Sequence, residues 1–523
     1  MIQIVDIKIS ADRLNDHDHI RTKIQRKLEW SKSKPFHYKL LKRSIDARKN
    51  IPLFQLRYQI SPEKFGPPSD DSIKFVQSEK GTKVIIVGSG PAGYFAALQC
   101  IELGLKPVIL ERGKDVKARR RDLKAIQQMG VVNPHSNYCF GEGGAGTYSD
   151  GKLYTRSKKR GDIIKTLQLL VDHGAKTDIL IDAHPHIGSN KLPGIIENIR
   201  MTIEKYGGEV HFNSYVTDII LDKDACRSVV LEDGREVKGD HFIIATGHSA
   251  RDIFKLFHDK QLLIESKPFA IGVRVEHPQA LIDEIQYNQN PREENLPASS
   301  YSMVCQIQNK GVFSFCMCPG GLIVPSATAP GEILVNGMSL SRRDSPFANS
   351  GIVTELSVKE LQSKGFDGVF GNMNFQASLE QKMFEHGDGS QKAPAQNLID
   401  FVNGQSMLQL NDCSYIPGIY QAPLHELLPT FIYERLRDGL LNFSLRMKGY
   451  FTDQANIVAL EGRTSSPVKI PRSNEMLCHP QVVNLYPCGE GAGYAGGILS
   501  AAMDGQRVVQ AIYKTINSKA LNN

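Results

Sequence analysis

A glycine-rich segment, Gly88-Ser89-Gly90-Pro91-Ala92-Gly93, has the residue types and spacing that can hold a phosphate group. It follows a short apolar run, residues 83–87, and precedes an apolar stretch that ends at Leu103. In a strand–turn–helix unit, the first glycine permits the tight turn, the second lets the backbone approach a pyrophosphate, and the third allows close packing of helix and strand. Backbone amides at the helix start then face the phosphates, where the helix dipole favours negative charge. We therefore predict a dinucleotide site in a Rossmann-like βαβ unit.

Two further features indicate which dinucleotide binds. Glu111 ends the next predicted strand, residues 106–111, where its carboxylate can accept both hydroxyls of an adenosine ribose and disfavours the 2′-phosphate of NADP. Residues 485–498 form a second glycine-dense turn at the start of another helix. A small NAD-binding domain does not need this turn, whereas the ribityl chain and isoalloxazine of FAD extend past the first phosphate site. Because a helix N-terminus near the flavin would stabilise the anionic reduced form, we predict FAD as the cofactor.

Three segments, residues 140–153, 463–469 and 486–498, resemble a known family. They are similar to the bacterial FAD-dependent dehydrogenases often called NAD(FAD)-utilising dehydrogenases, which have a glutathione-reductase-type FAD fold. The hydroxybenzoate hydroxylase and succinate dehydrogenase flavoproteins belong to the same branch of that fold. Residues 43–48 resemble the small domain appended to the family, so the resemblance covers nearly the whole chain. One departure is Gly462, which stands where the family pattern has threonine.

The resemblance implies a set of cofactor-binding residues. The pyrophosphate would lie against residues 88–93, with Glu111 and Arg112 at the adenosine and Val216 at the adenine. Three consecutive residues, Ala245, Thr246 and Gly247, would pass beside the dinucleotide. The residues that would approach the isoalloxazine are Gly146, Thr147, Ser149, Asp150, Lys152, Gly489, Glu490, Gly491, Gly496, Gly497 and Ile498. The family has no assigned substrate, so the resemblance predicts the cofactor and leaves the reaction open.

Reduced flavin carries out the redox chemistry itself, so a catalytic side chain is not obligatory. Among the candidates, Cys316 and Cys318 in the segment Cys316-Met-Cys318 could relay electrons between thiols and flavin. A disulfide between residues two apart is strained, and two thiols packed in or beside a strand are the commoner explanation. His248 directly follows the predicted turn at residues 245–247, where a capping role is the commoner alternative to a cofactor contact.

Other polar side chains suggest proton transfer or anion binding. His186, in the segment Asp182-Ala-His-Pro-His186, is a candidate for proton transfer in a substrate pocket. No third cluster of ligands lies nearby in the sequence, so we predict no metal site. Arg463, which precedes a Thr-Ser-Ser run, is a candidate for contacts with the flavin or an anionic substrate. Arg274 and the pair Arg342-Arg343 are weaker candidates, because ordinary ion pairing explains most arginines.

The composition bounds the class of protein. With 41% hydrophobic and 23% charged residues, the chain is typical of a globular protein. No apolar run approaches the roughly 18 residues of a membrane span, and the start of the sequence lacks a signal-peptide pattern, so we expect no membrane partner and a cytoplasmic location. The nine cysteines include no Cys-x-x-Cys pair, so we expect neither a zinc ribbon nor a thioredoxin-like redox pair.

The hydrophobic pattern and the turn-forming residues predict the domains. The spacing of apolar residues in 1–62 predicts a small basic α+β domain, with strands at 5–9, 37–41 and 51–60 and a helix at 16–30. Residues 63–80 are rich in Pro, Gly, Ser and Asp and are predicted to be a linker. The FAD-binding domain then spans 81–250 and resumes at 456–523, with a substrate or cap domain of mixed α+β character inserted at 251–455.

Within the FAD-binding domain, residues 209–220 and 228–231 predict a β-meander in the same sheet as strands at 241–247 and 482–489. The predicted fold class is therefore α/β, with a Rossmann-like FAD domain, an inserted mixed α+β domain and a small N-terminal α+β domain.

The net charge of +7 is concentrated near the N-terminus. Residues 21–49 contain eleven Lys and Arg against two acidic residues. Such a run is most often a solvated surface, although it would also suit an acidic partner, such as an electron-carrier protein, or a nucleic acid.

Three functions are compatible with these features. The leading hypothesis is an FAD-dependent dehydrogenase or reductase of a small organic substrate, with NADH or NADPH as a transient electron donor. The second is a flavoprotein that acts on RNA delivered by the basic N-terminal domain. The third is a non-catalytic, flavin-binding redox module that recruits a partner.

Overall fold

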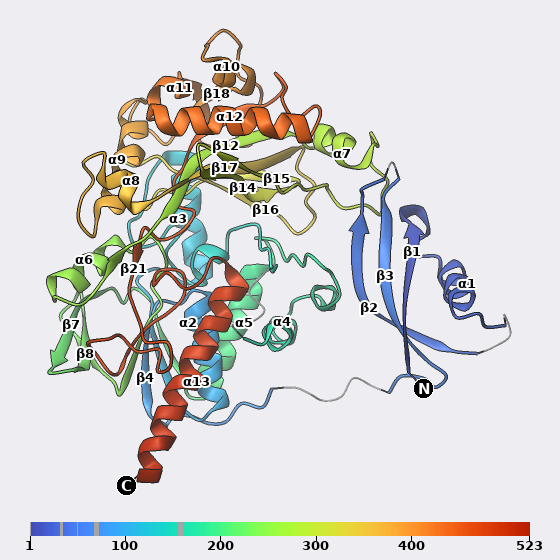
Figure 1. The fold of residues 1–523 in the computed structure, drawn as a ribbon. Helices are drawn as coiled ribbons and strands as arrows, with labels where there is room; N and C mark the ends of the chain where they lie inside the picture. Colours follow the sequence, from blue (N-terminus) through green and yellow to red (C-terminus); the bar gives the residue numbers. More distant parts are fainter. Residues whose placement is uncertain (1, 32–34, 50, 67–72, 155–160, 523) are drawn as a thin grey trace.

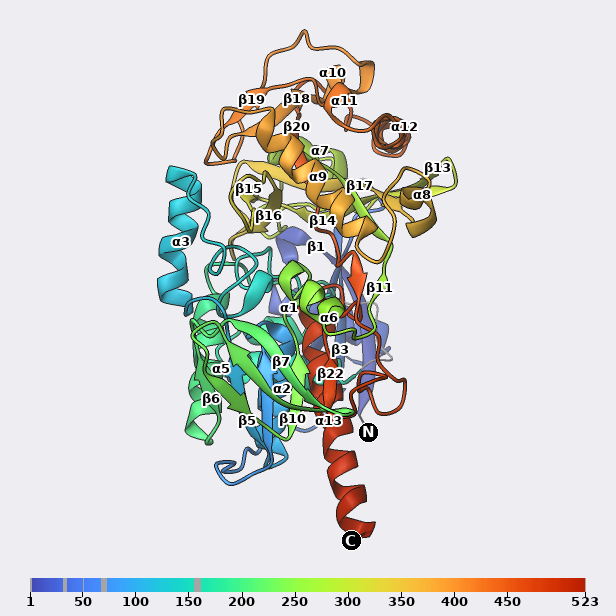
Figure 2. The ribbon, with the colours of Figure 1, turned by 90° about the vertical axis from the view of Figure 1, so that its left-hand side faces the viewer.

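The structure, a computed structural model, describes residues 2–31, 35–49, 51–66, 73–154 and 161–522. Over these residues the chain has a mixed α/β fold, in which a small N-terminal unit stands beside a larger body of two stacked parts (Figure 1). Figure 2 shows the same stacking after a quarter turn, with the end of the C-terminal helix extending away from the body. Residues 67–72 of the predicted linker and residues 32–34 of the basic segment lie outside the described residues.

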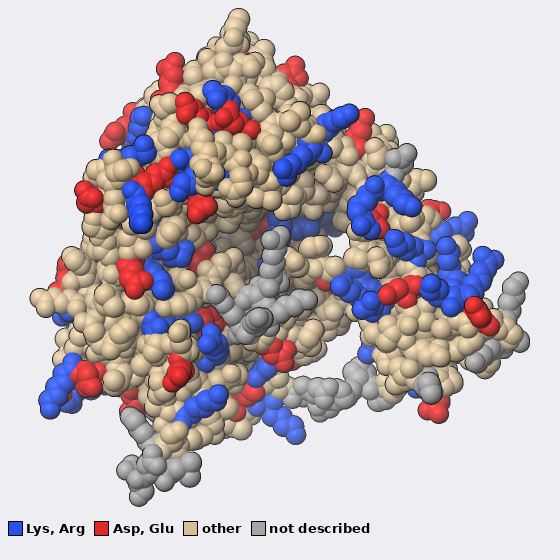
Figure 3. Space-filling view, in the orientation of Figure 1, with Lys and Arg blue, Asp and Glu red and all other residues tan. Residues whose placement is uncertain are grey.

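The N-terminal unit is an antiparallel sheet with a helix, as predicted. Its strands run in the order β1 (Gln3–Ser10), β3 (Leu53–Ser61), β2 (His37–Asp46), and its helix is α1 (His17–Lys27). The alternating apolar residues of β3 all point into a small core, which α1 covers with Ile20 and Ile24. Asp16 caps α1 by accepting a hydrogen bond from the His19 amide at 2.9 Å. Figure 3 shows Lys and Arg side chains gathered over this unit.

A parallel five-stranded sheet forms the centre of the lower part of the body. Its order is β22 (Leu485–Pro487), β10 (His241–Ile244), β4 (Lys83–Val87), β5 (Lys106–Leu110), β6 (Glu209–His211). The strands predicted at 83–87, 106–111, 241–247 and 482–489 are thus confirmed. Alternate residues of β4 face opposite layers, with Val84 and Ile86 toward the helices and Ile85 and Val87 toward the other face. The helical layer consists of α2 (Pro91–Glu102), α4 (Ile163–Asp172), α5 (Leu192–Lys205) and α13 (Ile498–Asn522).

The β-meander is a separate sheet, which corrects the prediction that it belongs to the central one. Strands β7 (Val216–Asp222), β8 (Ala225–Leu231) and β9 (Glu236–Lys238) pair only with one another and cover the second face of the central sheet. Only β6 of the predicted segment joins the central sheet. The break comes at Asn213, whose φ of +51° turns the chain out of the central sheet after β6.

A mixed seven-stranded sheet forms the second part of the body. Its order is β13 (Val304–Ile307), β14 (Lys310–Cys318), β17 (Phe347–Leu356), β12 (Phe269–Pro278), β20 (Asn456–Glu461), β18 (Ala393–Asn397), β19 (Ile419–Gln421). The short pairs β15 (Gly321–Pro325) with β16 (Val335–Ser339), and β11 (Glu265–Ser266) with β21 (Val468–Lys469), lie outside it. Around these strands are α3 (Val116–Met129), α7 (Gln279–Tyr287), α8 (Val358–Gln362), α9 (Gly371–Glu385), α10 (Leu398–Asn403), α11 (Leu424–Leu427) and α12 (Thr430–Arg446).

Two elements pack across the predicted boundaries of the inserted domain. Strand β20 lies beyond the predicted end at residue 455, yet it pairs with β12 and β18 inside the seven-stranded sheet. Helix α6 (Arg251–Asp259) lies after the predicted start at residue 251, yet its Phe254 and Phe257 pack in the core beneath the central sheet. Both placements depend on long-range pairing and packing, which the local sequence pattern does not encode.

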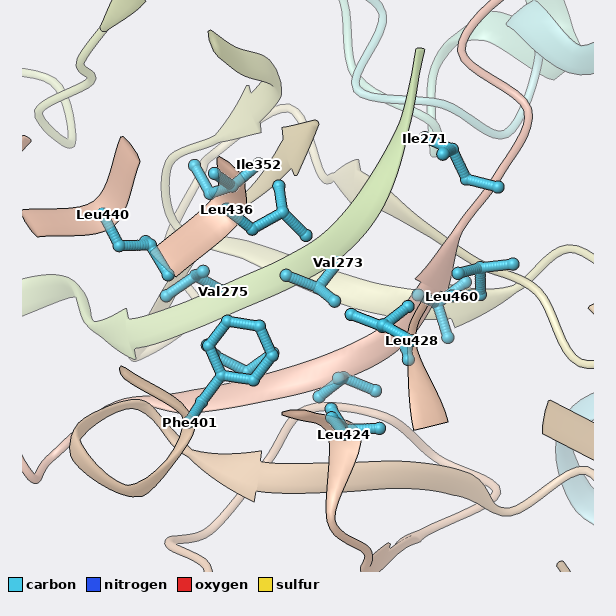
Figure 4. Close-up of a cluster of buried hydrophobic side chains, with 14 of the residues drawn as sticks. Ile271, Val273, Val275, Ile352, Phe401, Leu424, Leu428, Leu436, Leu440 and Leu460 are labelled. Atoms are coloured by element: carbon cyan, nitrogen blue, oxygen red, sulfur yellow. The ribbon is translucent and has the colours of Figure 1, made fainter. Parts of the chain in front are cut away.

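The core of the inserted part is apolar on both faces of its sheet. Strand β12 reads Phe-Ala-Ile-Gly-Val-Arg-Val, a nearly continuous buried run that is typical of a strand covered on both sides. Helix α12 lies on this sheet through Leu436 and Leu440, and the segment 398–428 closes the other side (Figure 4). None of the helices in the described parts of the chain has both the length and the apolar character needed to cross a lipid bilayer.

Two leucines of α12 provide a matched test of this packing. Leu436 is 0% exposed and Leu445 is 79% exposed. We expect Leu436→Ala to lower the free energy of unfolding by about 2–5 kcal/mol, because it leaves a cavity in the core. Leu445→Ala should change it by no more than ~0.5 kcal/mol. Urea denaturation followed by circular dichroism measures both, and equal effects of the two substitutions would contradict the packing described.

Candidate functional site

A cavity of about 840 Å³ lies between the central sheet and the seven-stranded sheet. Its walls include residues of the segments 88–93, 140–153 and 485–498, together with the end of β14 from the inserted part. A volume of this size lies within the range of cofactor and ligand sites in proteins. The predicted cofactor residues that line it are Gly88, Gly90, Pro91, Ala92, Glu111, Arg112, Gly146, Ser149, Asp150, Lys152, Val216, Ala245, Thr246, Gly247, Gly489, Glu490, Gly496, Gly497 and Ile498.

The first wall is the turn from β4 into α2. Gly88 has a φ of +105°, and a Cβ there would lie 2.5 Å from the Ala245 carbonyl oxygen. A Cβ on Gly93 would lie 2.0 Å from the carbonyl oxygen of Gly88, so this glycine allows helix and strand to pack closely, as predicted. Helix α2 begins with Pro91 after Gly90, which places its free N-terminal amides at the cavity.

Four predicted cofactor residues do not line the cavity. Ser89 is fully buried and donates its hydroxyl to Glu111 at 2.8 Å. Gly93 packs against β4, and a Cβ on Gly491 would lie 2.3 Å from the Gly247 carbonyl oxygen. Thr147 donates its hydroxyl to the Glu142 carbonyl at 3.3 Å. Each of these four residues bonds to or packs against a neighbouring group of the protein, so it supports the shape of a turn without lining the cavity.

Glu111 lines the cavity, but its carboxylate is already engaged. It accepts hydrogen bonds from the Ser89 amide at 2.9 Å and hydroxyl at 2.8 Å, from the Gly113 amide at 2.8 Å and from the Gly141 amide at 3.0 Å. The carboxylate therefore ties the phosphate turn to the end of β5 and to the segment before residue 144. Its contact with a ribose stays a prediction.

Arg112 and two aromatic rings form one end of the cavity. The guanidinium lies 4.4 Å from the Phe140 ring centre and 4.2 Å from that of Tyr215, and it makes two hydrogen bonds with the Asp252 carboxylate, at 3.1 and 2.6 Å. Val216 lies in the same wall. Flat, partly charged surfaces of this kind suit a nucleobase. Sequence reasoning missed Phe140 and Tyr215 as partners, since nothing in their spacing marks them.

Part of the cavity wall is bare glycine backbone. A Cβ on Gly247, Gly496 or Gly497 would meet no atom within 4 Å, although each of these residues lines the cavity. A Cβ on Gly146 would instead touch Ile498 at 3.0 Å. The turns at residues 146, 247 and 496 thus leave open space where an extended cofactor can lie against peptide groups, so the residues present fit FAD.

A buried ionic cluster forms the end of the cavity next to the inserted part. The carboxylate of Asp150 lies 2.9 Å from Arg343, 3.4 Å from Lys152 and 3.7 Å from His186. Burial alone would raise the pKa of Asp150, but the positive charges of Lys152 and Arg343 outweigh it and lower that pKa to about 2. Asp150 Oδ1 and Arg343 Nε are buried without a hydrogen-bond partner among the described residues. Such unpaired atoms are rare and suit a polar ligand.

His186 belongs to this cluster through its approach to Asp150, but it does not line the cavity. Burial, and the nearby charge of Arg343, lower the pKa of His186 to about 4, so its ring is neutral at neutral pH. His184 lines the cavity, as does His248, whose pKa burial lowers to about 4. Among the described residues, no three His, Cys, Asp or Glu side chains are grouped so as to hold a metal ion.

Arg463 lines the cavity, and most of its N–H groups are bonded within the protein. Its guanidinium donates to both carboxylate oxygens of Glu380 at 2.9 and 2.8 Å, to Glu332 at 2.7 Å and to the Thr328 hydroxyl at 2.5 Å. Four of the five N–H groups of an arginine are thus used within the protein. These bonds give Arg463 a structural role, and its contact with an anion or the flavin stays a prediction.

Arg274 is likewise structural. It is fully buried and bonds Glu461 at 2.7 Å and Asn349 at 2.8 Å. Of the two candidate cysteines, Cys316 lines the cavity and Cys318 lies buried behind it. Glu490 also lines the cavity, and burial raises the pKa of its carboxyl group to about 7. Sequence reasoning did not foresee this shift, because it depends on burial that only the fold creates.

Gly496 offers a direct test of where the cofactor lies. A Cβ on Gly496 would meet no atom within 4 Å, and Gly496 lines the cavity, so we expect Gly496→Leu to take up cofactor space and FAD to bind at least about tenfold more weakly, a loss of ~1.4 kcal/mol or more. Gly194→Leu is the matched control, because Gly194 is exposed on α5 and a Cβ there also meets no atom. Titration of the apoprotein with FAD, followed by flavin fluorescence, gives both affinities. Unchanged binding by Gly496→Leu would exclude this cavity.

Comparison with known proteins agrees with the cofactor. Residues 268–464 match the family described as "FAD-dependent protein, C-terminal domain-like", and residues 1–61 match a domain of unknown function, DUF8436. Over a short stretch of 31 residues, 6% of this chain and 7% of the relative, the sequence is 58% identical to dihydrolipoyl dehydrogenase of Buchnera aphidicola.

Two solved structures are distantly similar. A mutant of the halogenase PltM in complex with FAD has a TM-score of 0.40 and 12% identity, over 84% of this chain and 70% of that one. A geranylgeranyl bacteriochlorophyll reductase-like protein from Thermoplasma acidophilum has a TM-score of 0.35 and 12% identity, over 84% and 80%. Similarity this distant says nothing about the reaction of this chain.

A full-length relative is far more similar. An uncharacterized protein of Clostridium beijerinckii is 38% identical over 531 residues, which cover 98% of this chain and 98% of the relative. The whole layout, from the N-terminal unit to the last helix, is therefore shared. The chain belongs to the same family as this Clostridium protein and is an FAD-dependent protein.

Proposed function

We propose that the protein is an FAD-dependent oxidoreductase, a dehydrogenase or reductase, that acts on a small anionic organic substrate in the cavity. One observation carries the proposal: the cavity that begins at the phosphate-binding turn of α2 ends against side chains of the inserted part. Cofactor and substrate would thus share one space. The parallel sheet, its meander and the inserted sheet together fit a glutathione-reductase-type arrangement, with the inserted part as the substrate domain.

The cavity residues divide by chemistry into three groups. The N-terminal amides of α2, with Gly90 and Pro91, would hold the pyrophosphate. The wall of Arg112 and Val216 would hold the adenosine, and the glycine turns at 146 and 496 would lie along the isoalloxazine. When bound, FAD supplies acceptance and release of a hydride equivalent, which no side chain of the protein provides.

The substrate end carries positive charge and one titratable acid. Lys152 and Arg343 face the cavity and suit a carboxylate or another anion. Asp150 stays ionised between them and fixes their positions. Glu490, with its pKa raised to about 7 by burial, can both hold and release a proton near neutral pH, which suits a general acid or base.

The electron donor can be tested directly. We expect anaerobic NADH or NADPH to bleach the flavin absorbance near 450 nm, because the open cavity lets a nicotinamide visit the flavin. Bleaching by either cofactor supports a nicotinamide-driven reductase. If neither bleaches the flavin while dithionite does, the donor is the substrate itself or a carrier protein, and the nicotinamide part of the proposal fails. A protein that no organic substrate then reoxidises would be a redox module without catalysis.

A second function is favoured by where the N-terminal unit sits. Strand β2 pairs with the segment that leads to the cavity wall, since the Arg43 amide donates to the Ile181 carbonyl at 3.0 Å and the Arg43 side chain bonds Asp182 at 2.7 Å. Two residues later, His184 lines the cavity, and its pKa is lowered by burial and by the charge of Lys42. Lys39 and Lys42 are exposed on this strand. A polyanion bound along β2 would therefore reach the cavity, which supports action on RNA.

This alternative makes its own prediction. Lys39→Gln with Lys42→Gln should weaken binding of a transfer RNA mixture and lower the slope of log Kd against log salt by about 1.4–1.8, because two phosphate contacts are lost. Lys124→Gln with Lys514→Gln removes the same charge from exposed positions outside the N-terminal unit and is the control. Gel-shift titrations at several salt concentrations give the slopes. Equal slopes for the two double variants would reject an RNA-binding role for β2.

A further inference from the structure

The end of strand β14 is irregular where it meets the cavity. Its pairing with β17 runs from Val312 to Phe315, breaks, and resumes at Cys318. Cys316 lies in the break with a φ of +45°, a left-handed conformation that is uncommon for any residue but glycine. Such a bulge changes the direction in which side chains point. As a result Cys316 lines the cavity.

The second thiol of the segment points back toward the first. Cys318 is fully buried, and its Sγ donates to the Cys316 carbonyl oxygen at 3.2 Å. The two cysteine side chains also lie within hydrogen-bonding reach of each other. The strain expected from the sequence applies to a regular strand, from which the backbone at Cys316 departs.

Two cations hold the backbone around these thiols. Lys152 Nζ donates to the Met317 carbonyl, and Arg274 Nη1 donates to the Cys316 carbonyl at 3.3 Å. A hydrogen bond from Cys318, together with the charges of Lys152 and Arg274, outweighs burial and lowers the pKa of Cys316 to about 6. The hydrogen bond with Cys316, and burial, raise the pKa of Cys318 well above its usual range. At neutral pH the pair thus holds one thiolate and one thiol.

The flavin end of the cavity is adjacent to this pair. Cys316 raises the pKa of Glu490, so the two groups interact electrostatically. Glu490 lies in the second glycine-rich turn, between Gly489 and the start of α13, which line the same cavity. Lys152, whose pKa is raised by Asp150 and by both cysteines against the effect of burial, comes from the other turn assigned to the isoalloxazine.

We propose that Cys316 and Cys318 are a redox-active pair that exchanges two electrons with FAD bound in this cavity. In the oxidative direction an S–S bond forms between the Cys316 thiolate and the Cys318 sulfur. Two electrons and the single proton of the Cys318 thiol leave together, and they convert oxidised FAD to its anionic reduced form. In the reverse direction reduced FAD returns the two electrons and the proton and opens the disulfide. Only FAD binding is required, and neither a nicotinamide nor the proposed substrate takes part.

Reductive titration separates this role from simple packing. The purified, air-oxidised holoprotein should consume about four electrons from dithionite per FAD, two for the flavin and two for the disulfide. Cys316→Ser and Cys318→Ser should each consume about two. Cys305→Ser is the matched control, because Cys305 is a buried thiol in the neighbouring strand β13 whose pKa burial raises, and it should behave as the wild type. Consumption of about two electrons by the wild type would overturn the proposal.

A second measurement needs no variant. The air-oxidised and dithionite-reduced proteins are quenched in acid and denatured, and their free thiols are alkylated and mapped by mass spectrometry. Cys316 and Cys318 should be unlabelled and joined in the first sample and labelled in the second, whereas Cys305 is labelled in both. Labelling of Cys316 and Cys318 in both samples would reject the pair. Because dithionite is the reductant, a failure of NADH or NADPH to reduce the flavin does not affect either result.

Discussion

The buried carboxylate of Glu111 accepts hydrogen bonds from three parts of the chain that must meet at the dinucleotide turn. Hydrogen bonds to a charged acceptor contribute roughly 1.5–3 kcal/mol each, and an unpaired buried carboxylate would be costly. The three segments therefore have to assemble together. The phosphate turn, the end of β5 and the glycine-rich segment before residue 144 are held in one arrangement, and the shape of the cavity follows from it.

A second charged cluster holds the inserted domain in position. Arg251 comes from α6 beneath the central sheet, whereas Glu380 comes from α9 and Arg463 follows β20. Burying so many charges gains little net stability, since desolvation offsets most of the attraction. A mismatched arrangement would leave a charge unpaired at a cost of several kcal/mol. The cluster thus sets the position of the substrate side relative to the cofactor side more than it adds to stability.

Much of the cofactor side was predictable from sequence because its signals are local. The turn at residues 88–93, the strands beside it and the second glycine turn are each marked by residue types that only a few backbone shapes require. The domain limits were less accessible, since β20 and α6 take their places through long-range pairing and packing. The roles of Arg463 and Arg274 were equally hidden, because their acidic partners lie 83 and 187 positions away in the chain. Cys316 was visible as a residue type, but its place in the cavity depends on a bulge that periodicity does not encode.

The order in which the cavity walls appear along the chain has a consequence for biosynthesis. Ile498 and the glycines before it complete the cavity, and α13 then packs against α2, where a Cβ on Gly505 would lie 2.1 Å from the Ala92 carbonyl oxygen. On the ribosome these residues emerge after the entire inserted domain. The turn at residues 88–93 is therefore synthesised early, and α2 lacks its contact with α13 until α13 has been synthesised. The cavity walls that residues 489–498 supply are thus available only after the inserted domain has been synthesised.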